Sequence, residues 1–287
     1  MKTWILRLAI LLGILVAAYL ATCVYMLVTQ EDKAFDPTPT PKNAPATAMD
    51  RAFEQVFIPV GSGRDQLHAY WLAQADANAP TFLYLHGQTH NNSTHPEHAQ
   101  RLYQLGYQVL MVDYRGFGKS IGGGKPSEPK LYEDAEAAWN YLTRKFEPNP
   151  QHIFIYGHSL GGAIAVELAT HHPDAAGLVT ESTFTSAPAI AKENYPWLPT
   201  DWLVRLRFNS LERVRTLKVP VLFIHGKLDV KVPFKMSQQL YDAAPEPKKK
   251  LLIEGGGHAN SAAIGWVEYD AVVTTFVQTQ FNRSIGR

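Results

Sequence analysis

Short apolar runs alternate with amphipathic stretches from about Phe53 to the C-terminus of this chain. Eight such runs read, in order, FIPV, LHAYWLA, TFLYLHG, YQVLMVDY, HIFIYG, GLVTES, VPVLFIHG and KLLIEG. Several are continuously apolar, as strands are when a sheet is buried on both faces. Helical patterns lie between them, including Lys130 to Phe146, Ala163 to His171 and Pro233 to Ala243. This alternation predicts a mostly parallel sheet covered by helices.

The N-terminal residues have a different composition. Leu8 to Gln30 carries no charged residue, and a helix of this length crosses the roughly 30 Å hydrocarbon core of a bilayer. Lys2 and Arg7 precede the run, whereas Glu31 and Asp32 follow it. Positive charge favours the cytoplasmic side. We therefore predict an uncleaved, single-pass membrane anchor, with the rest of the chain on the extracytoplasmic side.

Two alternatives for this segment are a cleaved signal peptide and a lipoprotein signal. The apolar region of a signal peptide is usually only about 7 to 15 residues long and ends in small residues. Leu20 to Cys23 has some likeness to a lipoprotein cleavage box, but Thr22 is bulky for that role and Val24 to Val28 continues the apolar run. The anchor is the favoured interpretation.

The expected organisation is an anchor over 1–30, a proline-rich linker over 31–52 and one globular domain over 53–287. A chain of 287 residues suits one α/β domain with appendages. Asp36 to Met49 contains four prolines and no hydrophobic period, so it predicts an extended spacer. Residues 187–218 interrupt the strand and helix rhythm and are predicted to form a small cap over the sheet.

Composition excludes several classes of function. A net charge of +1 gives no electrostatic case for binding nucleic acid. Cys23 is the single cysteine, so neither a disulfide framework nor a cysteine metal cluster is expected. His86, His90, His95 and His98 match no helical HExxH pattern, which favours a polar loop over a metal site. The glycine-rich stretch RGFGKSIGGGK fits no nucleotide-binding pattern, and no cofactor or metal is expected.

One serine lies between two glycines in Gly157-His158-Ser159-Leu160-Gly161. This G-x-S-x-G pattern is weak alone, but a predicted strand precedes it and a predicted helix follows it. In that context the turn lifts a nucleophilic serine out of the edge of the sheet. Ser159 is therefore a candidate nucleophile.

A serine hydroxyl needs an imidazole to take its proton and a carboxylate to orient that imidazole. In this architecture the order along the chain is serine, acid, histidine. His258 follows the last predicted strand, and Asp229 follows the strand before it. Asp229 could instead cap the next helix. Glu181, at the end of a neighbouring strand, is the alternative acid.

A tetrahedral oxyanion needs two preset backbone donors, one after the nucleophile and one in the loop after the third strand. Leu160 and Gln88 occupy these positions. Arg115, in DYRGFGKS, is expected to form structural hydrogen bonds beneath the site rather than to clamp a substrate.

The chain resembles α/β-hydrolase-fold serine hydrolases from about Phe53 to its C-terminus. The resemblance is closest to a membrane-anchored branch that includes lysophospholipid lipases, monoacylglycerol lipases and protein depalmitoylases. It rests on LYLHG, DYRGFGKS, GHSLGG, ESTFTS, RFNSLERV, PVLFIHGKLDVKVP and GGGHAN. It implies a mostly parallel eight-stranded sheet with helices on both faces and a small cap, preceded by a transmembrane helix.

The implied activity is hydrolysis of carboxylic esters or thioesters of acyl-chain or lipid-like substrates through Ser159, Asp229 and His258. An amidase or peptidase with the same residues, or a non-enzymatic tethered binding protein on the same fold, are the alternatives. The apolar cap includes Trp197 and Trp202. Most of its side chains are expected to fill the cap's own core, and any apolar surface left over, including these two residues, is predicted to line an acyl pocket.

The anchor is testable by topology reporters fused to the C-terminus of the full chain. We expect a reporter that is active only outside the cytoplasm to work, and one that is active only in the cytoplasm to fail. N-terminal sequencing is expected to show that the mature protein begins before the apolar run. A mature N-terminus beyond Val28 would refute the anchor.

Overall fold

The computed structural model describes residues 2–37, 39–40, 47–62, 64–92, 96–284 and 286. Its main element is an eight-stranded sheet with the order β10-β9-β8-β7-β4-β6-β3-β2. Neighbouring strands are parallel, except that β3 is antiparallel to β2 and to β6. The expected mostly parallel, eight-stranded sheet is confirmed. The strands are β2 (Glu54–Val60), β3 (Asp65–Leu72), β4 (Thr81–Leu85), β6 (Gln108–Val112), β7 (Ile153–His158), β8 (Gly177–Glu181), β9 (Val221–Gly226) and β10 (Lys248–Ile253).

Both faces of the sheet are covered by helices because successive apolar side chains point to opposite sides. In β4, Leu83 and Leu85 pack in the core shared with α4, α5 and α9. Phe82 and Tyr84 pack in a second core shared with α3 and α11. Burial on both sides explains the continuous apolar strands. The helices are α2 (Ala48–Ala52), α3 (Glu97–Gln104), α4 (Glu128–Lys145), η1 (Pro150–His152), α5 (Leu160–His171), α9 (Lys235–Ala243), α10 (Ser261–Ile264) and α11 (Trp266–Ser284).

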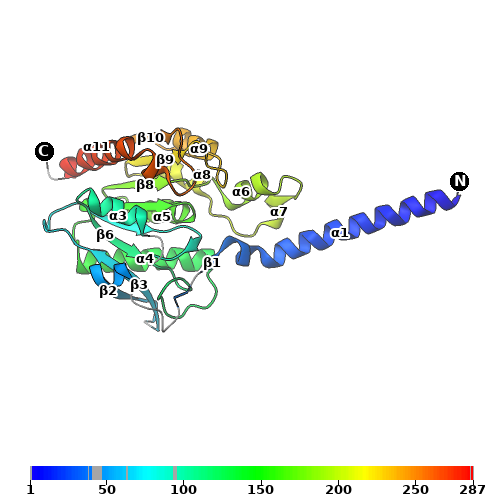
Figure 1. Ribbon diagram of the computed structural model, residues 1–287, viewed down its shortest axis with the longest axis horizontal. Helices are drawn as coiled ribbons and strands as arrows, with labels where there is room; N and C mark the ends of the chain where they lie inside the picture. The colour runs from blue at the N-terminus through cyan, green and yellow to red at the C-terminus, as the bar shows by residue number, and fades with distance from the viewer. Residues whose placement is uncertain are drawn as a thin grey trace.

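The N-terminal helix α1 (Lys2–Ala34) projects from the domain as one long rod (Figure 1). Residues Thr3–Ala34 are long and apolar enough to cross a membrane, by length and composition only. The end of the helix is attached to the domain, because Phe35 is 2% exposed and packs against Phe208. The next residues form β1 (Asp36–Pro37), which pairs in parallel with β5 (Thr89–His90).

This attachment differs from the extended spacer expected from the sequence. The helix continues past residue 30, and the residues after it bind the domain through a buried aromatic ring and backbone pairing. Residues 41–46 of the expected linker lie outside the described residues.

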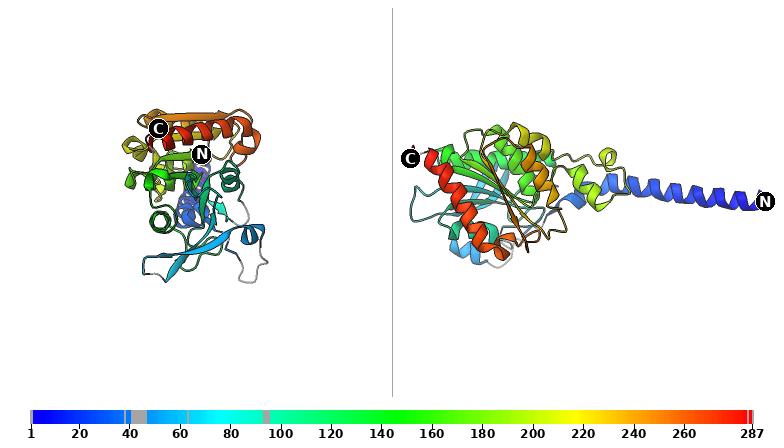
Figure 2. Two further views of the ribbon diagram at one scale, coloured as in Figure 1. Left: turned by 90° about the vertical axis from the view of Figure 1, so that its left-hand side faces the viewer. Right: turned by 90° about the horizontal axis from the view of Figure 1, so that it is seen from above.

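The segment between β8 and β9 contains only short helices. They are α6 (Ala187–Asn194), α7 (Thr200–Leu203), α8 (Ser210–Arg213) and η2 (Val214–Thr216). Helices α6 and α7 lie at the end of the domain from which α1 projects (Figures 1 and 2), and α7 contacts α1. We refer to residues 187–218 as the cap.

The turn between β7 and α5 brings two backbone segments unusually close. Ser159 adopts φ 54° and ψ −116° at this corner. A Cβ atom at Gly161 would lie 2.1 Å from the carbonyl oxygen of Leu85, and one at Gly157 would lie 2.2 Å from the carbonyl oxygen of Gly161. Both flanking glycines are therefore required by backbone contacts.

We expect Gly161→Ala to destabilise the domain by at least about 1–3 kcal/mol, the usual cost of overpacking. The added methyl group meets backbone atoms, which have no alternative rotamer. Gly257→Ala is the matched control, because its nearest neighbour is the Asn260 side chain at 3.2 Å. Thermal unfolding is expected to give a lower midpoint for Gly161→Ala alone. Equal midpoints for the two variants would contradict the close approach.

Candidate active site

Three side chains that are far apart in the sequence meet beyond the carboxyl ends of the parallel strands. Ser159 follows β7, Asp229 follows β9 and His258 follows β10. The His258 Nε2 atom lies 2.9 Å from Ser159 Oγ, and its Nδ1 atom lies 2.8 Å from Asp229 Oδ2. In this arrangement an imidazole can take the serine proton while a carboxylate holds the ring in the required tautomer.

The two oxygens of Asp229 have different partners. Oδ1 accepts hydrogen bonds from the backbone N–H groups of Lys231 and Val232, each at 2.9 Å. Oδ2 faces His258, and His225 Nε2 lies 3.2 Å from it. Burial opposes ionisation, but the hydrogen bonds from His225 and His258 hold the pKa of Asp229 below its usual value. Asp229 therefore stabilises its own turn with one oxygen and contacts the imidazole of His258 with the other.

Glu181, the alternative acid, has other partners. It is fully buried at the end of β8, accepts a hydrogen bond from the Tyr156 hydroxyl and lies 3.6 Å from His98 Nε2. Burial opposes ionisation of Glu181, but His98 and the Tyr156 hydroxyl lower its pKa to about 2. The structure thus places a buried carboxylate behind the serine, in contact with His98.

His158 is a residue of the site that the sequence pattern did not indicate. Its Nε2 atom donates a hydrogen bond to the carbonyl oxygen of His258 at 2.8 Å. Burial, together with the nearby His98, lowers the pKa of His158 to about 3, so the ring is neutral at pH 7. His158 therefore supports the loop that carries His258. Its place next to Ser159 was the available sequence signal.

Leu160 and Gln88, the candidate oxyanion residues, both line the cavity beside Ser159. Leu160 begins α5. The loop of Gln88 passes close to the serine, since a Cβ atom at Gly87 would lie 3.4 Å from Ser159 Cβ.

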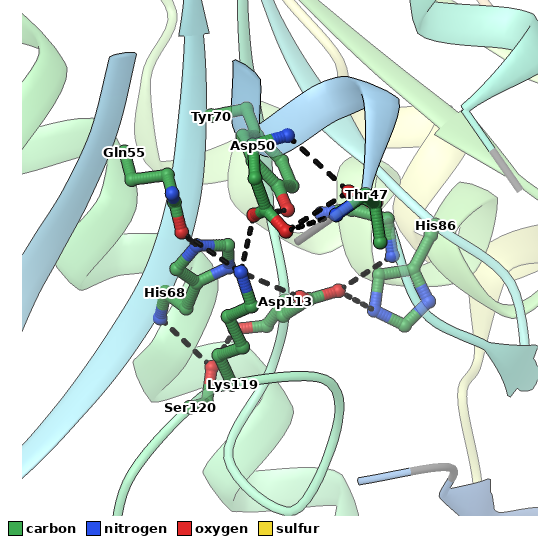
Figure 3. Close-up of polar contacts among 10 residues, drawn as sticks. Thr47, Asp50, Gln55, His68, Tyr70, His86, Asp113, Lys119 and Ser120 are labelled. Atoms are coloured by element: carbon green, nitrogen blue, oxygen red, sulfur yellow. Dashed lines mark hydrogen bonds and ion pairs between the residues drawn. The ribbon is translucent and has the colours of Figure 1, made fainter. Parts of the chain in front are cut away.

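Buried Asp113 holds the far end of this loop. Its Oδ1 atom accepts the backbone N–H of Asn92 at 2.8 Å, and His68 and His86 lie on either side of the carboxylate (Figure 3). The polar contacts of this region continue through Lys119 to Asp50.

Arg115 contacts three carboxylates and does not line the cavity. Its guanidinium pairs with Asp65, Glu133 and Asp134. Burial opposes its charge, but these carboxylates raise the pKa of Arg115. The contacts are those of a structural residue that ties α4 to the sheet.

A cavity of about 1270 Å³ lies beside Ser159 and His258. Its apolar wall comes from α1 and the cap and includes Met26, Ile190, Leu203, Val204 and Phe208. This volume and lining suit a substrate with a long apolar part.

The structure places neither Trp197 nor Trp202 on the cavity wall. Trp202 is 90% exposed, and Trp197 is 56% exposed and contacts Tyr19 of α1. Leu198 and Phe208 take the inward positions of the cap instead.

Within the described part of the chain, no group of three or more His, Cys, Asp or Glu side chains is placed to hold a metal ion. His95 and the side chain of His90 lie outside the described residues. His86 and His98 contact Asp113 and Glu181, respectively.

Residues 77–211 match the family model of serine aminopeptidase, S33. The chain is 34% identical to the protein Rv2307c of Mycobacterium tuberculosis, over 92% of this chain and 94% of that protein. It is also 34% identical to the lysophosphatidylserine lipase ABHD12 of Danio rerio, over 67% of this chain and 55% of that protein. An esterase of Pyrococcus furiosus has the same fold, with a TM-score of 0.68, 21% identity and coverage of 85% and 96% of the two chains.

Asp229 and Glu181 have different hydrogen-bond partners, so replacing each of them by its amide is expected to have a different effect on activity. We expect Asp229→Asn to lower p-nitrophenyl ester turnover by roughly three to four orders of magnitude, through loss of imidazole orientation. Glu181→Gln is expected to reduce turnover far less, because Glu181 contacts His98 instead. Rates are compared per folded molecule, with near-UV circular dichroism as the check on folding. The reverse ranking would assign the orienting role to Glu181.

Proposed function

Because this chain belongs to the α/β-hydrolase family, we propose that it is a membrane-tethered serine hydrolase that cleaves carboxylic ester or thioester bonds of acyl substrates. The observation that carries this proposal is the continuous hydrogen-bonded chain from Asp229 through His258 to Ser159, next to the cavity. The helix α1 acts as the tether, and the hydrolase domain lies on the extracytoplasmic side.

In the first half of the reaction, His258 Nε2 takes the proton of Ser159 while Oγ attacks the substrate carbonyl carbon. The carbonyl oxygen becomes an oxyanion that accepts hydrogen bonds from the backbone N–H groups of Leu160 and Gln88. Protonated His258 then gives its proton to the leaving alcohol or thiol, and the acyl group stays on Ser159.

In the second half, His258 takes a proton from a water molecule that attacks the acyl-enzyme. The second tetrahedral intermediate uses the same two backbone donors. When it collapses, the carboxylic acid leaves and the proton returns from His258 to Ser159. Asp229 stays ionised throughout and keeps the Nδ1 proton of His258 directed toward its Oδ2 atom.

The apolar wall of the cavity supports an acyl-chain or lipid-like substrate. The Danio rerio relative, a lysophosphatidylserine lipase, is named for an activity of the same chemical kind. The description of the matched family model, serine aminopeptidase, favours a second candidate, which is cleavage of an amide or peptide bond by the same three residues. An apolar wall built from α1 and the cap fits an acyl group better than the free amine of a peptide.

We expect Ser159→Ala to abolish both hydrolysis of p-nitrophenyl esters and labelling by a fluorophosphonate probe, because the attacking oxygen is absent. Ser127→Ala is the matched control, since Ser127 precedes α4, does not line the cavity and makes no side-chain cap hydrogen bond. Labelling of the Ser159→Ala variant at the wild-type level would end the proposal. Peptide and ester substrates tested side by side separate the two candidate activities.

A further inference from the structure

One face of the second half of α1 is turned toward the cap. Met26, Gln30, Lys33 and Ala34 all line the cavity beside Ser159. Their spacing of three and four residues places them in one stripe along the helix. Cys23, one turn earlier, is 8% exposed on the same stripe. The anchor is therefore also a wall of the candidate active site.

Hydrogen bonds hold α1 against the cap at two levels. The Gln30 side chain accepts the backbone N–H of Arg205 at 2.6 Å and donates to the carbonyl oxygen of Leu203 at 3.4 Å. The Tyr19 hydroxyl donates to the carbonyl oxygen of Trp197 at 3.2 Å. These levels are eleven residues apart in the helix, which corresponds to about 16 Å along its axis.

The same end of α1 reaches the loop that carries Gln88. The Gln88 side chain donates to the carbonyl oxygen of Lys33 at 2.8 Å, and the backbone carbonyl oxygen of Gln88 accepts the backbone N–H of Asp36 at 3.3 Å. The helix therefore contacts both the cap and the candidate oxyanion loop, on either side of the cavity.

The cap exposes aromatic side chains next to the apolar helix. Trp202 is 90% exposed, Trp197 is 56% exposed and Tyr195 is 36% exposed. Figure 2 shows the cap beside α1 where the helix leaves the domain. Trp197 contacts Tyr19, which belongs to the candidate membrane-spanning helix. A helix that spans the bilayer therefore brings this side of the cap, with its exposed aromatic side chains, against the lipid, and tryptophan and tyrosine are the side chains that favour contact with a membrane surface.

We propose that the acyl chain of a membrane-resident amphiphile passes from the bilayer into the groove between α1 and the cap, with its ester carbonyl at Ser159. This inference rests on the proposed hydrolase function. The groove begins at the lipid interface and continues to the serine, so an acyl chain reaches the site without crossing water. Met26, Leu203 and Val204 contact the chain, and the tether itself contributes to substrate binding.

The test uses the full-length protein in nanodiscs and a large side chain placed in the groove. We expect Met26→Trp to lower kcat/KM for p-nitrophenyl dodecanoate at least about tenfold, equivalent to losing roughly two buried methylenes. The readout is the ratio of the kcat/KM values for p-nitrophenyl dodecanoate and p-nitrophenyl acetate, because an acetyl group is too short to extend along the groove. Val28→Trp is the matched control, because Val28 is 74% exposed and does not line the cavity.

The proposed groove would be contradicted if Met26→Trp lowered kcat/KM equally for both esters. It would also be contradicted if Met26→Trp and Val28→Trp had the same kcat/KM values. The Ser159→Ala variant in the same nanodiscs distinguishes failure of the hydrolase proposal from failure of the groove proposal. If that variant still hydrolyses both esters, the hydrolase proposal fails, whereas a failure confined to the Met26 comparison leaves it intact.

Entry of the acyl chain from the bilayer is tested by a separate measurement. Tryptophan fluorescence is measured for the wild-type protein and for Trp202→Phe in nanodiscs with and without brominated phosphatidylcholine. We expect the fluorescence difference between the two proteins, which isolates Trp202, to be quenched by the brominated lipid. An unquenched difference means that this face of the cap stays in water, and it overturns access from the bilayer.

Discussion

The close approach of α5 to the end of β4 is the constraint on which the candidate site depends. Gly161 lies against the carbonyl oxygens of Leu85 and His86, at a distance that is too short for any residue with a Cβ atom. This contact raises Ser159 above the sheet edge and brings the first amide groups of α5 next to the loop after β4. This one backbone contact thus positions the serine and both candidate oxyanion donors.

Buried polar groups hold the surrounding loops in place. Asp229 serves its own turn with one oxygen and His258 with the other. Behind the serine, Glu181 contacts His98, and the ring of His98 lies 4.5 Å from that of His158, which donates to the backbone of His258. Charged and polar groups at this depth are stable only with such partners, so these contacts also restrict where the imidazole can lie.

The helix α1, the proposed tether, and the candidate site form one physical unit in this architecture. A helix that only anchored the domain would need no contact with the cavity, yet α1 contacts the cap through Gln30 and the Gln88 loop through Lys33. Phe35 then buries its ring in the domain core. The proposed attachment to the membrane and the shape of the cavity therefore depend on the same short stretch of chain.

The sequence by itself determined the eight strands, the helices α4, α5 and α9, and the order of Ser159, Asp229 and His258, because apolar period and local motifs are properties of neighbouring residues. Only the tertiary structure decided that α1 forms a wall of the cavity, that Trp197 and Trp202 face outward, and that His158 supports the loop of His258. These features depend on the angles at which distant elements pack, which no local pattern encodes. Phe35 shows the difference: its sequence neighbours indicate a linker, and its burial follows from a ring contributed by Phe208 of the cap.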